Sequence, residues 1–104
     1  MDLAFQSAST LARLIRDREI SAEALLEHFL ARMERFNPAL NAIVVTDLDA
    51  ARRRAQEADA ALAAGQLWGP LHGVPMTIKE TFEVAGLPTT AGARNLRDYR
   101  STTN

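Results

Sequence analysis

Residues 69–92 read GPLHGVPMTIKETFEVAGLPTTAG and contain four of the chain's five glycines and three of its four prolines. Within this stretch, Val74 to Ile78 favours a short strand, because side chains alternate between faces there. Met76 and Ile78 would then share one face, and Lys79 would lie on the other, where the strand meets a loop. Rigid scaffolds often present catalytic groups at such strand ends. This stretch is therefore the first place to look for chemistry.

On the C-terminal side, residues 80–104 show no helical periodicity and little tendency to form strands. A single strand cannot form a sheet, since its backbone N–H and C=O groups need partners. We therefore expect the segment to belong to a larger fold and the chain to be truncated.

On the N-terminal side, residues 1–65 have the spacing of amphipathic helices. Ser9 or Thr10 is expected to cap a first helix and Ser21 a second, which Asn37-Pro38 should end. A short β-branched run at residues 41–46 suggests a strand or an extended segment. Thr46 or Asp47 should then cap a third helix, and Gly65 should end it.

Composition narrows the classes of function. The 104 residues carry a formal net charge of -1, which does not attract nucleic acid or an anionic membrane. The absence of cysteine excludes disulfides and thiolate metal sites, and the two histidines lack ligand partners at metal spacing. We find neither a membrane-spanning run nor a secretory signal, so a cytoplasmic location is expected.

The motifs of residues 69–92 occur in an order that closely resembles the lysine segment of the amidase-signature family. That family shows a Gly-Pro-Leu-His-Gly-(Val/Ile)-Pro lead, a lysine followed by Asp or Glu, and a Gly-Leu-Pro-Thr-Thr-x-Gly loop. Here these are Gly69 to Pro75, Lys79-Glu80, and Gly86 to Gly92. The helices and their Asn37-Pro38 connection resemble the family's N-terminal region as well.

The resemblance implies an α/β fold, in which helices cover a mixed sheet. Residues 1–104 would form the N-terminal part of one domain, with 1–65 mainly helical and 66–104 supplying the first strand and the lysine loop. The partners it implies are a small-molecule amide and, for assembly, a second copy of the chain. Neither a metal, an organic cofactor, a membrane nor direct contact with nucleic acid is expected.

The resemblance also implies a Ser–Ser–Lys mechanism. Lys79 would act as the base for a bridging serine, which activates a nucleophilic serine, and the amide yields an acid and ammonia or an amine. A lysine has an ordinary pKa of about 10.4, so a lysine base near pH 7 has to be enclosed by protein. The four serines of this chain, at positions 7, 9, 21 and 101, match no nucleophile motif. We therefore expect the chain alone to be inactive.

Two other readings stay open. In the amidotransferase relative, the same chemistry releases ammonia for a second active site, which implies further protein partners and charged tRNA. Alternatively, the chain is a stand-alone helical interaction module that uses the apolar stripe from Leu25 to Phe36. Among the remaining polar residues, we expect His72 to be structural, Glu80 to orient backbone or a neighbour, and Thr89 and Thr90 to order the loop.

Overall fold

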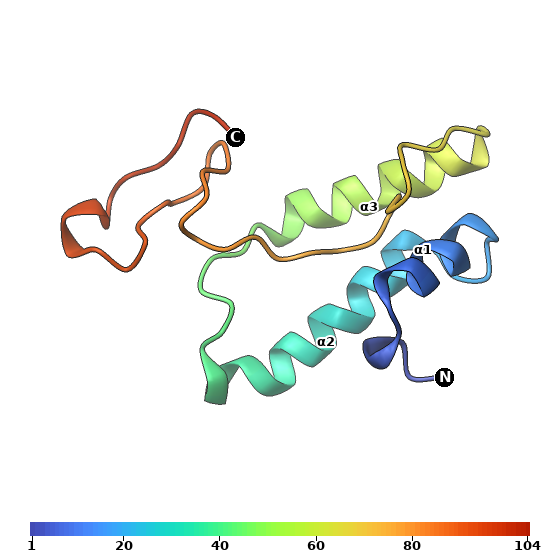
Figure 1. Cartoon of the computed structure of the whole chain (residues 1–104), viewed down its shortest axis with the longest axis horizontal. Helices are drawn as coiled ribbons and strands as arrows, with labels where there is room; N and C mark the ends of the chain where they lie inside the picture. The colour runs from blue at the N-terminus through green and yellow to red at the C-terminus, as the bar shows by residue number, and fades with distance from the viewer. The chain divides into compact units, whose positions relative to one another are not determined.

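The computed structural model describes residues 1–104 and is helical in its first two thirds (Figure 1). In chain order the elements are η1 (Leu3–Phe5), α1 (Ala8–Arg16), α2 (Ala22–Leu40), α3 (Leu48–Ala63) and η2 (Arg94–Leu96). The chain divides into two compact units. The helical unit comprises Met1–Leu40 and Asp47–Pro75, and the lysine-bearing unit comprises Asn41–Thr46 and Met76–Asn104. No helix is both long and apolar enough to span a lipid bilayer.

The start of α1 differs from the prediction. Ser7 caps the helix, because its Oγ accepts a hydrogen bond from Thr10 N at 3.1 Å. The predicted caps were wrong: Ser9 and Thr10 lie inside the first turn, and their hydroxyls bond to Ser7 Oγ. Three hydroxyl residues within four positions all suit a cap, so the local sequence did not single out Ser7.

The end of α2 was also predicted wrongly. The helix passes through Pro38 and ends at Leu40. Proline removes one backbone N–H and crowds the preceding turn, but this did not stop the helix one turn early. The chain leaves the helical path only at Asn41, whose φ of 48° lies in the left-handed region that asparagine adopts more readily than most residues.

Both ends of α3 agree with the prediction. Asp47 is the cap, since its carboxylate accepts from Ala50 N at 3.1 Å. Gly65 has a φ of 78° and donates to Leu62 O, and Gln66 N donates to Ala61 O at 2.8 Å. This pair of bonds is the Schellman arrangement that commonly ends helices at a glycine.

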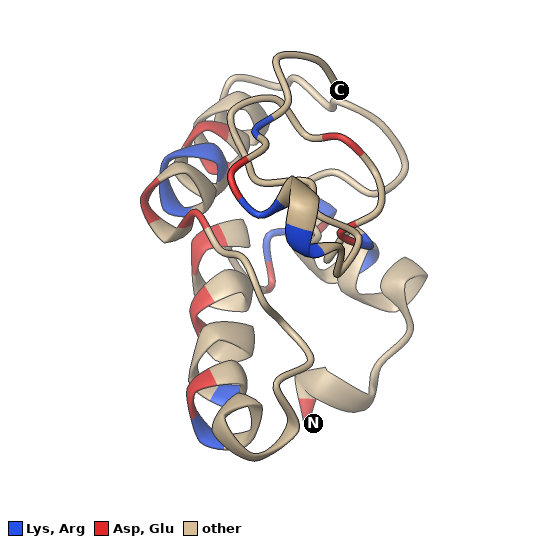
Figure 2. Ribbon diagram, turned by 90° about the vertical axis from the view of Figure 1, so that its left-hand side faces the viewer, with Lys and Arg blue, Asp and Glu red and all other residues tan.

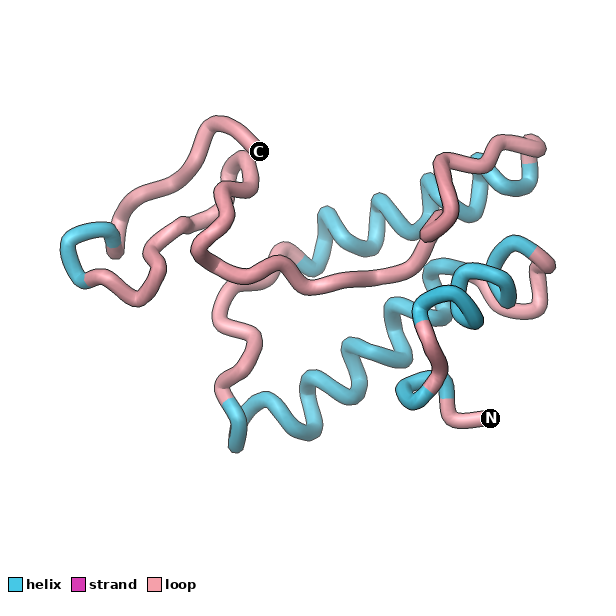
Figure 3. Tube along the Cα trace, viewed as in Figure 1, coloured by secondary structure: helices cyan, strands magenta, loops and turns pink.

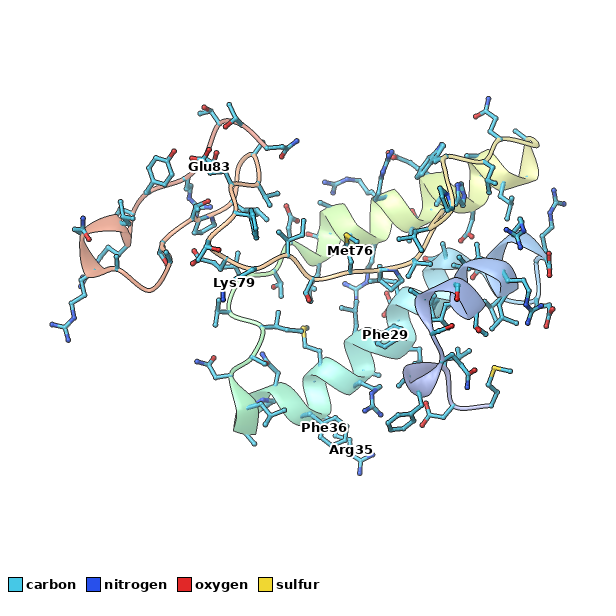
Figure 4. The ribbon with its side chains drawn as sticks, viewed as in Figure 1. Phe29, Arg35, Phe36, Met76, Lys79 and Glu83 are labelled. Carbon is cyan, nitrogen blue, oxygen red and sulfur yellow. The ribbon has the colours of Figure 1, made fainter.

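The core of the helical unit lies among the three α-helices. Its buried members are Leu11, Leu14, Ile15, Ala22, Leu25, Leu26, Ala55 and Ala58. The alanines of α3 keep that helix close to α2. The apolar stripe predicted for α2 is buried only in its first turns, since Phe29 is partly buried against the core whereas Phe36 is exposed (Figure 4). The guanidinium of Arg35 lies 4.8 Å from the Phe36 ring centre.

A long-range cap ties α3 to the start of α2. The Asp59 carboxylate accepts from Ala22 N at 2.7 Å and from Glu23 N at 3.1 Å. Ser21 Oγ accepts from Ala24 N, which confirms the predicted cap. Figure 2 shows acidic and basic residues interspersed along the helices, and Arg52 of α3 pairs with Glu27 of α2 at 2.6 Å.

The predicted strands do not form. Residues 41–46 and 74–78 run as extended loop and not as strands (Figure 3). The only β-type pairing is an isolated bridge between Pro88 and Arg100. The chain is thus mainly helical, and the sheet expected of an α/β fold is absent from these residues. The physical reason is that a strand is stabilised by a neighbour, and these 104 residues supply none.

Candidate functional site

The lead of the motif, Gly69 to Pro75, belongs to the helical unit and is held there by His72. The His72 side chain is buried, at 5% exposure. Its Nδ1 accepts from Trp68 N at 3.0 Å, and its Nε2 lies 2.8 Å from Ala58 O. These partners fit one neutral tautomer, with the proton on Nε2. Because both ring nitrogens are used inside the protein, His72 is structural, as predicted.

Gly73 brings the same lead against the helices. Its φ is 77°, and a Cβ atom built there would lie 2.9 Å from Ala22 Cβ and 3.3 Å from two atoms of Ile15. Only glycine meets both demands without strain. Val74 follows and packs against the core. The Gly-Pro-Leu-His-Gly-Val-Pro lead therefore docks on the three helices through a buried histidine and a glycine.

Lys79 lies in the lysine-bearing unit, in the segment that continues from this lead. It is the only lysine of the chain, and its side chain is exposed. Lys79 O accepts from Phe82 N at 2.9 Å, so the backbone turns directly after the lysine. Its Nζ has neither a hydrogen bond nor an ion pair within the chain. Figure 4 shows Met76 and Lys79 on opposite sides of the extended segment, as the predicted alternation requires.

Glu80 links the lysine segment to the Gly86–Gly92 loop. Its Oε1 accepts from Thr90 N at 2.5 Å, and its Oε2 accepts from Thr90 Oγ1 at 3.0 Å and from Ala91 N at 2.7 Å. These bonds, that of Thr90 N foremost, hold the pKa of Glu80 below its ordinary value. The predicted roles of Glu80 and Thr90 are thus confirmed. We call this set of three bonds the Glu80 clamp.

The other loop threonine behaves differently. Thr89 is buried, and its N donates to Tyr99 O at 3.2 Å. Its hydroxyl has no hydrogen-bond partner within the chain. Thr89 thus orders the loop through its backbone rather than through its side chain.

A second anchor, which the sequence did not reveal, closes the lysine-bearing unit. The Glu83 carboxylate accepts from Tyr99 Oη at 2.7 Å and from Thr103 Oγ1 at 3.2 Å. The bond from Tyr99 is the main cause that lowers the pKa of Glu83, and the same bond raises the pKa of Tyr99. Gly86 N donates to Ser101 O, so the two chain segments run side by side. Glu83 and Tyr99 are sixteen positions apart and share no local motif.

The serines have structural roles. Ser7 and Ser21 accept hydrogen bonds at helix starts, and Ser9 bonds to Ser7. Ser101 is buried at 3% exposure, and its Oγ donates to Thr103 O at 2.8 Å. No serine pairs with Lys79. No group of three or more histidine, aspartate or glutamate side chains is arranged to hold a metal ion.

Comparison with known proteins agrees with the motifs. Residues 24–104 match the Amidase family. The chain is 38% identical to an acylamidase of Rhodococcus erythropolis over 103 residues, which cover 99% of this chain and 22% of that protein. It is 41% identical over 98 residues to one component of the glutamyl-tRNA(Gln) amidotransferase of Acidothermus cellulolyticus, and these residues cover 94% of this chain and 19% of that protein. It is also 42% identical over 92 residues to a putative amidase, AmiB2, of Mycobacterium tuberculosis, and these residues cover 88% of this chain and 20% of that protein.

The chain thus spans about a fifth of the length of these curated relatives. The matched region includes the lysine, the acidic residue after it and the Gly86–Gly92 loop. This chain belongs to the amidase-signature family and corresponds to its N-terminal region.

Proposed function

We propose that the chain is the lysine-bearing part of an amidase domain that hydrolyses a small carboxamide to a carboxylic acid and ammonia or an amine. Lys79 would be the base of a Ser–Ser–Lys triad whose two serines lie outside these 104 residues. One observation carries the proposal: Lys79 ends an extended segment, and the acidic residue after it holds the Gly86–Gly92 loop, in a chain whose family match covers this whole region.

The geometry supports inactivity of the chain alone. A general base has to lie within hydrogen-bond reach of the group that it deprotonates. Lys79 Nζ has no serine partner. The one serine of the lysine-bearing unit is Ser101, and its hydroxyl donates a hydrogen bond to Thr103 O. Lys79 is also exposed, so any enclosure of its amine has to come from other residues.

Exposed apolar side chains on the segment that bears the lysine support such a cover. Met76 is 71% exposed, Phe82 66% and Ile78 54%. Several large apolar side chains gathered on one short segment typically mark a surface that other protein covers. We propose that the remainder of the amidase domain packs on this segment and supplies both the serines and the enclosure.

The amidotransferase component is the second candidate, because a relative with that name is as similar to this chain as the acylamidase is. Both candidates use amide hydrolysis with the same lysine as base. A stand-alone interaction module has less support, because Leu25 and Leu26 of the α2 stripe are buried in the core. A cytoplasmic location and a homodimer stay predictions.

A chimera tests the proposal. Residues 1–104 would replace the matching segment of the Rhodococcus erythropolis acylamidase, and the release of amine from an acyl amide would be measured. We expect the 104-residue chain to be inactive and the chimera to hydrolyse the amide, with the unaltered acylamidase as the reference. A chimera that melts as cooperatively as the acylamidase but hydrolyses nothing would contradict the proposal, as would activity of the isolated chain.

A further inference from the structure

We propose that Glu80 is a positioning residue for Lys79: through its clamp on Thr90 and Ala91, it fixes the backbone from which the lysine side chain extends. The structural part of this inference stands on the hydrogen bonds of the chain. Its catalytic part rests on the proposed function.

The contacts fix the peptide after Lys79 from two directions. The carbonyl of Lys79 accepts from Phe82 N at 2.9 Å, which closes the turn. The next side chain, Glu80, accepts three hydrogen bonds from Thr90 and Ala91. The clamp therefore joins two segments ten residues apart next to the lysine.

The clamp needs a carboxylate of this length. All three partners are donors, and an ionised carboxylate has two oxygens that only accept. In Glu80→Gln one oxygen becomes an NH2 group, which would face the backbone N–H of Thr90 or of Ala91, whichever way the amide is turned. In Glu80→Asp the charge stays, but the carboxylate is one methylene short. The left-handed φ of 48° at Ala91 is an uncommon conformation for a residue other than glycine, so the turn depends on such outside support.

The link to catalysis is the sensitivity of a base to its position. A displacement of about 1 Å in a reacting group costs roughly a hundredfold in rate. In this proposal the clamp acts on the position of the base, and substrate binding is left to residues outside the clamp. Loss of the clamp should therefore lower kcat and leave KM nearly unchanged.

Amide hydrogen exchange on the 104-residue chain tests the clamp without any need for activity. In Glu80→Gln we expect exchange of the Thr90 and Ala91 amides to accelerate by about tenfold or more, and Phe82 N, which bonds to Lys79 O, to accelerate with them. The Thr89 amide, bonded to Tyr99 O, should change by less than about threefold and shows that the unit stays folded. Thr90→Val removes one of the three donors and should give a smaller effect of the same kind.

Two results of this experiment would overturn the inference. Unchanged exchange at Thr90 and Ala91 would show that the clamp does not stabilise the loop. Acceleration there without any change at Phe82 would show that Glu80 orders the loop but does not hold the lysine.

The acylamidase chimera tests the catalytic part. We expect Glu80→Gln to lower kcat by roughly ten- to a hundredfold, with KM within about twofold of the parent, and Glu80→Asp to recover part of the loss. Glu57→Gln is the matched control, because Glu57 is an exposed partner of Arg54 on α3 and should change neither constant. A rise in KM at unchanged kcat would contradict a positioning role. An inactive parent chimera would instead refute the proposed function. The exchange experiment would still test whether the clamp holds the backbone after Lys79.

Discussion

Replacement of Gly73 by alanine gives the sharpest test of how the motif docks on the helices. The new Cβ would lie 2.9 Å from Ala22 Cβ and 3.3 Å from two atoms of Ile15, and both neighbours are fully buried. Overpacking of this kind costs about 1–3 kcal/mol, and a left-handed φ adds about 1–2 kcal/mol for a residue with a Cβ. We therefore expect Gly73→Ala to lower the free energy of unfolding by about 2–5 kcal/mol.

Gly65→Ala is the matched control for this variant. Gly65 has nearly the same φ, 78° against 77°, but no atom lies within 4 Å of the Cβ position. Gly65→Ala should therefore lower the free energy of unfolding only by the cost of the left-handed backbone, about 1–2 kcal/mol. Urea unfolding followed by circular dichroism of the helices measures both variants. Equal losses for Gly73→Ala and Gly65→Ala would refute the close packing of the motif against α1 and α2.

Three further predictions concern the polar contacts of the two units. Asp59→Ala removes the cap from two N–H groups at the start of α2 and should cost about 1–2 kcal/mol in urea unfolding, whereas a cost near zero would show that water replaces the cap. His72→Ala leaves the part-buried Trp68 N–H without its acceptor, at about 1–3 kcal/mol, and should alter the fluorescence of the single tryptophan, whose ring lies 4.9 Å from the histidine ring. Glu80 and Glu83 have lowered pKa values in the folded chain. Their ionised carboxylates therefore stabilise the fold above the ordinary glutamate pKa, and this stabilisation is lost as pH falls through the pKa values of the folded chain. Amide exchange in the lysine-bearing unit should thus accelerate in acid relative to α1, and a uniform response of both units would contradict this.

The sequence predicted those features of the fold that depend on neighbouring residues. Asp47, as one of two candidate caps beside Thr46, and Gly65 were identified as the ends of α3 because a cap and a left-handed glycine act within one turn. The cap of α1 was missed because several hydroxyls compete there. The Asp59 cap was invisible, since it joins residues about 37 positions apart and depends on how α2 and α3 pack.

The same distinction applies to the site. Lys79 is predicted as a site residue from an ordered motif, and the role of Glu80 toward a neighbouring backbone was foreseen in kind. Its partners Thr90 and Ala91 were not, because no local pattern links them. The strand that the motif predicted did not form, because the pairing of a strand depends on residues that are far away in the sequence or outside it.

The turnover of the acylamidase chimera with methionine at position 79 tests the role of Lys79 most directly. Methionine has a similar length but cannot accept a proton, so the loss of a general base should lower kcat by roughly a hundred- to ten-thousandfold. Lys79→Arg should be about as slow, because a guanidinium keeps its proton in proteins. If the methionine variant turned over at the rate of the parent, Lys79 would not be the base, and the proposed mechanism would be wrong.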